Sequence, residues 1–148
     1  VNTIMGDFYQ ERGDLIKNLA YKRKALTIAE VLGDESVLIL ANRNLGGYYI
    51  FAGDFAKALE YLLKAMKSAE KINDKGKIID LHLQLGSCYS SSKNFALAKS
   101  HFLKQLALTD STNINAVSNI YNNLADMYVR QKTTHPDSIA QAVLYIDK

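Results

Sequence analysis

A short motif of apolar, small and aromatic residues recurs four times along this chain at nearly constant spacing. Each copy has an apolar residue, then Gly or Ala, then Tyr three positions later. The copies begin at Met5, Leu45, Leu85 and Leu124, which gives steps of 40, 40 and 39 residues. Such regularity in a chain of 148 residues is typical of a repeat protein, in which one supersecondary unit is duplicated and stacked.

Each repeat is expected to contain two helices. In the second copy, Ala58, Leu62 and Ala65 are spaced by three and four residues, which places them on one face of a helix. Gly53 and Asp54 precede them, and they suit the left-handed end of one helix and the N-cap of the next. Similar pairs recur along the chain and predict helices over residues 1–12, 15–32, 35–52, 55–72, 75–92, 95–109, 113–131 and 138–148.

Small residues stand where the two helices of a pair must approach closely. The expected contacts are Gly46 with Ala58, Gly86 with Ala98, and Ala125 with Ala142. Because one pair cannot bury its apolar face alone, successive pairs should stack into a right-handed superhelix with a concave inner surface. The predicted fold class is therefore all-α, a single solenoid of about four helical hairpins over residues 1–33, 34–73, 74–110 and 111–148.

The charge and composition exclude several classes of partner. The 18 basic and 15 acidic residues are interspersed, which does not favour nucleic-acid binding. No run of residues is long and apolar enough to predict membrane contact within this stretch. Cys88 is the only cysteine, so it cannot form an internal disulfide. Both ends fall inside the repeat pattern, and we expect the chain to be an excerpt of a longer protein.

Residue patterns typical of catalysis are not found. The three histidines, His82, His101 and His135, do not have the four-residue spacing of a helical metal site. Cys88 lies inside an expected helix, where a small apolar role is favoured over a nucleophilic one. There is no glycine-rich phosphate loop and no nucleophile elbow. The sequence therefore predicts a non-catalytic protein with no metal and no cofactor.

The motif Leu45-Gly46…Tyr49…Gly53-Asp54…Ala58…Ala65, with its counterparts, resembles the tetratricopeptide repeat over nearly the whole chain. The usual repeat has about 34 residues, whereas the period here is 40. The longer form is similar to the repeats of kinesin light chain, of spindle-orientation adaptors and of bacterial regulators and sensor kinases. The resemblance implies that a protein or peptide segment binds to the concave surface formed by the first helix of each pair.

Candidate binding residues follow from this implied placement. A carboxamide precedes the Leu-Gly or Leu-Ala pair in three repeats, at Asn44, Gln84 and Asn123, and each is expected to face solvent. An amide both donates and accepts hydrogen bonds, which suits recognition of an extended backbone. Simple duplication of a solvated polar position would also produce this pattern. The candidate concave-face residues are Arg43, Asn44, Gln84, Ser87, Asn119, Asn123, Asp126 and Arg130.

Two functions are compatible with these features. In the first, the chain is a protein-interaction module that acts as a scaffold or a signalling input region. In the second, it is a structural or regulatory spacer within a larger protein, such as a bacterial sensor kinase or transcriptional regulator.

The longer joint at residues 133–137 is interpreted as tolerated surface length. The last helix lacks a polar cap, so its end is expected to fray or to mediate self-association.

Overall fold

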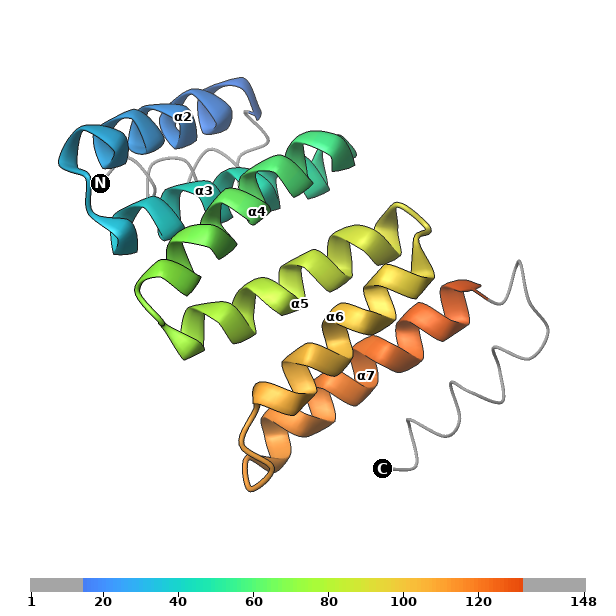
Figure 1. Ribbon diagram of the computed structural model, residues 1–148. Coiled ribbons are helices and arrows are strands. Elements are labelled where there is room, and N and C mark those ends of the chain that lie inside the picture. The colour runs from blue at the N-terminus through green and yellow to red at the C-terminus, as the bar shows by residue number, and fades with distance from the viewer. Residues whose placement is uncertain (1–14, 132–148) are drawn as a thin grey trace. The chain divides into compact units, whose positions relative to one another are not determined.

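The computed structural model describes residues 15–131, and this part of the chain folds into six α-helices (Figure 1). The predicted all-α class is confirmed, and each predicted helix boundary in this range lies within one residue of the observed one. The helices expected at 1–12 and 138–148, and the joint at 133–137, lie outside the described residues. The six helices are α2 (Leu15–Leu32), α3 (Glu35–Phe51), α4 (Phe55–Lys71), α5 (Lys75–Ser91), α6 (Phe95–Leu108) and α7 (Ile114–Gln131).

The predicted N-caps are present at intervals of about 20 residues. Each capping side chain accepts a hydrogen bond from a backbone N–H two or three residues later, which satisfies one of the unpaired donors of the first turn. Asp34 Oδ1 lies 2.8 Å from the nitrogen of Ser36, and Asp74 Oδ1 lies 3.0 Å from the nitrogen of Lys77. The residues that cap in this way are Asp34, Asp54, Asp74, Asn94 and Asn113.

The residue before each of the first four caps has a left-handed backbone, as the turn pattern predicts. The φ angles are +65° at Gly33 and +76° at Gly53, where glycine incurs no steric cost. The next two joints have φ angles of +52° at Asn73 and +63° at Lys93. Asn tolerates this region well, whereas Lys does not, so the joint at Lys93 carries local backbone strain.

Replacing Lys93 by glycine is therefore expected to raise the free energy of unfolding by about 0.5–1 kcal/mol, because the left-handed conformation would no longer crowd a Cβ atom. Urea denaturation followed by circular dichroism would measure the change. Gly53→Ala is the matched control and should lower stability, because it introduces the same strain at a joint that now lacks it. A loss of stability in Lys93→Gly would contradict this account of the joint.

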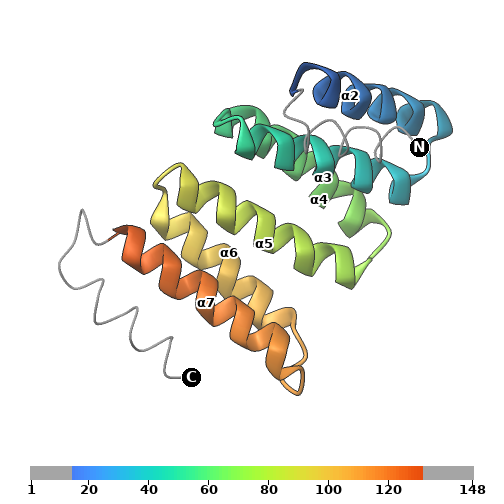
Figure 2. The ribbon, with the colours of Figure 1, turned by 180° about the vertical axis from the view of Figure 1, so that it is seen from behind.

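The chain divides into two compact units, residues 1–78 and 79–148. In the first unit, successive helices α2, α3 and α4 run in opposite directions, and the two views in Figure 1 and Figure 2 agree on this. Side chains on all three helices form its core, and they are fully or almost fully buried. These core residues are Ala29, Ile39, Ala41, Leu45, Tyr49, Ala58, Leu62, Ala65, Met66 and Ala69.

Helices α3 and α4 pack closely at Gly46, and Ala58 lies near this glycine as predicted. A Cβ atom built there would lie 2.6 Å from two side-chain atoms of Leu62 and 3.4 Å from the carbonyl oxygen of Ala58. The absence of a side chain at Gly46 therefore allows the close packing of α3 on α4. Beside this core, Arg23 Nη2 donates to the Tyr49 hydroxyl at 3.1 Å, and this hydrogen bond links α2 to α3.

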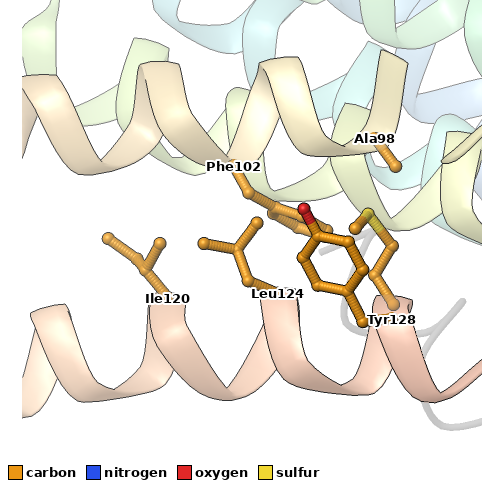
Figure 3. Close-up of a cluster of buried hydrophobic side chains, with 6 residues drawn as sticks. Ala98, Phe102, Ile120, Leu124 and Tyr128 are labelled. Carbon is orange, nitrogen blue, oxygen red and sulfur yellow. The ribbon is translucent and has the colours of Figure 1, made fainter. Parts of the chain in front are cut away.

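The second unit contains the rest of α5 together with α6 and α7. Its hydrophobic cluster lies mainly between α6 and α7, where Phe102 and Leu124 point toward each other (Figure 3). At Gly86, a Cβ atom would lie 2.6 Å from the Phe102 ring, so the nearest neighbour of this glycine is Phe102 of α6. The predicted contact of Ala125 with Ala142 lies outside the described residues. The cluster consists of Ala98, Phe102, Ile120, Leu124, Met127 and Tyr128.

None of the helices in residues 15–131 combines the length and apolar character needed to span a lipid bilayer.

Candidate functional site

A cleft of about 210 Å³ opens within the second unit. Helix α5 contributes three serines, α7 contributes three polar or charged side chains, and the Phe102 ring of α6 adds an apolar wall. Helices α5 and α7 are the first helices of their pairs, and these helices are the ones expected to carry the binding surface. The lining residues are Ser87, Ser90, Ser91, Phe102, Asn123, Asp126 and Arg130.

The spacing of residues along α5 and α7 explains why these side chains converge. Ser87 and Ser91 are four residues apart on α5, so they lie one above the other on the same face of that helix. Asn123, Asp126 and Arg130 are separated by three and four residues, which places them in a row along α7. Two polar rows therefore border the cleft, one from each helix.

The charged groups of the cleft are paired with each other. Arg130 Nε donates to Asp126 Oδ2 at 2.7 Å, and both side chains are more than half exposed. An exposed pair of this kind contributes at most about 1 kcal/mol to stability. Its main effect is that the cleft has no excess of either charge, while Ser hydroxyls and the Asn123 amide provide both hydrogen-bond donors and acceptors.

The eight candidate residues are distributed over both units. Four of them line the cleft: Ser87, Asn123, Asp126 and Arg130. Asn119 is exposed on α7 one turn before Asn123, and Gln84 is half-buried on α5 three residues before Ser87, but neither lines the cleft. Arg43 and Asn44 belong to α3 in the first unit and are half-buried.

The expectation that the three carboxamides face solvent is wrong in detail. Asn44, Gln84 and Asn123 are all half-buried. The Asn44 Nδ2 atom is inaccessible to solvent and has no hydrogen-bond partner among residues 15–131. The position before the Leu-Gly pair lies at the edge of the helix–helix contact, so neighbouring side chains cover part of the amide.

Three lining residues were not among the candidates. Phe102 is an almost fully buried core residue that also lines the cleft. Ser90 and Ser91 lie near the C-terminal end of α5, one turn beyond the Leu85-Gly86 pair from which the candidates were chosen. The four-residue spacing from Ser87 could have identified Ser91 as a candidate from the sequence.

Cys88 has no role at the surface. It is fully buried, and burial raises the pKa of its thiol to about 11. A thiol with so high a pKa is a poor nucleophile at neutral pH, because the thiolate is the reactive form. The predicted role of Cys88 as a small apolar core residue is consistent with this environment.

Comparisons with known proteins give one consistent result. Two models described as tetratricopeptide repeat match residues 1–71 and 79–112, which together make up more than two thirds of the chain. Among curated proteins, no sequence match was found. The solved structures that match include the crystal structure of BtubC (BKLC) from P. vanneervenii, with a TM-score of 0.72 and 19% sequence identity. That similarity covers 98% of this chain and 68% of the BtubC chain, and at this identity it concerns the fold alone.

Proposed function

This chain belongs to the tetratricopeptide repeat family, and from that premise we propose that it binds an extended segment of another protein in the cleft between α5 and α7. Domains of this family generally serve as protein–protein interaction modules and are typically non-catalytic. The fold of the family is a superhelix of stacked helical pairs, whose first helices line the inner surface. We propose the same non-catalytic binding role for this chain.

The observation that supports this proposal is the convergence of four candidate residues on one cleft. Ser87, Asn123, Asp126 and Arg130 were selected only from their positions within the repeat, and they come from two different helices. Polar side chains that meet in a cleft beside an apolar wall are typical of sites that orient a ligand by hydrogen bonds.

The chemistry of the cleft favours a peptide backbone over a single charged group. An extended backbone presents alternating N–H and C=O groups, each of which needs a partner when it is taken out of water. Hydroxyls and an amide can serve either kind of group, whereas the Asp126–Arg130 pair leaves no excess charge to select an anion or a cation.

We would test the site with peptides selected from a random display library against the whole chain. Fluorescence anisotropy would give the dissociation constant of each selected peptide for wild type and for Asn123→Ala. Loss of a buried hydrogen-bond partner costs about 1–3 kcal/mol, so we expect Asn123→Ala to weaken binding by about tenfold or more. Ser87→Ala should weaken binding from the opposite wall of the cleft.

Asn115→Ala is the matched control, because Asn115 is an exposed amide on the same helix α7 that does not line the cleft. It should leave the dissociation constant unchanged within about twofold. Equal binding by Asn123→Ala, Ser87→Ala and wild type would show that the peptides bind elsewhere. A selection that yields no specific peptide would also contradict the proposal.

A further inference from the structure

Two histidines that are far apart in sequence meet within the second unit. His82 lies on α5 and His101 lies on α6, and their Nδ1 atoms are 3.0 Å apart. The ring centroids are 5.2 Å apart, with a tilt of 49° between the ring planes. Both residues are half-buried, so the pair has access to solvent. This pair lies outside the cleft and plays no part in the proposed function.

The environment keeps one ring of the pair neutral. The pKa of His101 is lowered to about 4 by burial, by the neighbouring His82 and by Lys104 on the same helix. The Tyr89 ring of α5 stacks against His101, with centroids 5.4 Å apart and planes 23° apart, which fixes the orientation of that imidazole. A neutral imidazole carries one nitrogen with a lone pair, and this nitrogen is the one that binds metal ions.

We propose that His82 and His101 form a binding site for a divalent transition-metal ion of the zinc, nickel and copper class, held by the two Nδ1 atoms. Metal–imidazole bonds of about 2.0–2.1 Å separate two neighbouring ligand nitrogens by about 2.9 Å at a right angle and about 3.4 Å at the tetrahedral angle. The observed separation of 3.0 Å lies within this range. For both lone pairs to meet at one ion, the His82 ring must turn about its side-chain bonds, while the Tyr89 ring holds the His101 imidazole.

The donor set determines the kind of ion and how strongly it is held. Imidazole nitrogens suit zinc, nickel and copper ions better than magnesium or calcium. In residues 15–131 no group of three or more His, Cys, Asp or Glu side chains is arranged to hold a metal, so water would complete the coordination. A site with two protein ligands is therefore open and exchanges its ion readily.

Binding requires a shift of one proton and no redox change. In the Nδ1–Nδ1 hydrogen bond, one ring carries its proton on Nδ1 and donates it to the other. When the ion binds, that proton moves to Nε2 of the same ring, so that both rings are neutral Nε2–H tautomers. Two metal–nitrogen bonds form as two waters leave the hydrated ion, and the hydrogen bond between the rings is lost. The ion then links α5 to α6, whose close packing at Gly86 and Phe102 already holds the two ligands in place.

The test is thermal unfolding of the whole chain, followed by circular dichroism, with increasing Zn²⁺ in a buffer that does not bind metal. Wild type should show a rise in Tm of several degrees when Zn²⁺ reaches about a hundred times its dissociation constant. Titration calorimetry should give one ion per chain. His101→Gln and His82→Gln should each weaken binding by at least about tenfold and abolish the rise in Tm. His135→Gln is the control and should leave it unchanged.

A second measurement does not depend on whether a variant folds. In wild type labelled with ¹⁵N, Zn²⁺ should shift the Nδ1 resonances of His82 and His101 and leave those of His135 in place. Three results would overturn the site: no rise in Tm at millimolar Zn²⁺, a rise that persists in a folded His101→Gln protein, or Nδ1 resonances that do not respond. Peptide binding to the cleft is measured separately, so failure here leaves the proposed function intact.

Discussion

Replacing Phe102 by alanine is expected to lower the free energy of unfolding by about 3–5 kcal/mol. Phe102 is only 2% exposed, and its ring packs against the hydrophobic cluster between α6 and α7 and against Gly86 of α5. Removing the ring deletes apolar contacts on all three helices at once and leaves a cavity that their backbones cannot close. Urea denaturation monitored by far-ultraviolet circular dichroism would measure the loss.

Leu103→Ala is the control for this prediction, because Leu103 is the next residue on the same helix and is 39% exposed. It should cost no more than about 1 kcal/mol, since much of its side chain is already in contact with water. Similar losses in Phe102→Ala and Leu103→Ala would mean that the packing at Phe102 does not hold the second unit together.

Alanine substitutions at the adjacent glycines 46 and 47 are expected to change stability in opposite directions. A Cβ at Gly46 would lie 2.6 Å from Cγ and Cδ2 of the fully buried Leu62, and overpacking of this kind costs about 1–3 kcal/mol. A Cβ at Gly47 meets no atom within 4 Å. Gly47→Ala should therefore stabilise the protein by about 0.5–1 kcal/mol, because alanine is the better helix former.

The same denaturation experiment on the two single variants tests this contrast. The double variant Gly46→Ala with Leu62→Ala should be more stable than the sum of the two single losses predicts, because the smaller side chain relieves the clash. Destabilisation by both glycine substitutions, or additive losses in the double variant, would show that helix packing at Gly46 is not the limiting contact.

The helix boundaries were predictable because local residues determine them. The left-handed residue and the cap at Gly53-Asp54 act within one turn of the chain, and the same holds at Gly33-Asp34. Even Lys93, which is a poor residue for that backbone, follows from the repeat spacing. The position of each helix therefore follows from short stretches of sequence.

Contacts between helices were harder to predict from the sequence than the helix boundaries. His82 and His101 are 19 residues apart, and no rule about spacing along one helix brings them together. The pattern of small residues pairs Gly86 with Ala98, and it did not show that the Phe102 side chain is the nearest neighbour of this glycine. The solvent exposure of Asn44 also depends on which neighbouring side chains cover it. Such features require the packing of one helix on another.

The even spacing of the joints has a consequence for insertions and deletions. Helices α3, α4 and α5 each have 17 residues. Deleting one residue from such a helix would rotate all later side chains by about 100° about its axis, which would turn the apolar face away from its partner. The joint between α6 and α7 has five residues, whereas the others have two or three. Chain length can therefore change there, or by a whole helical pair, without altering which faces meet.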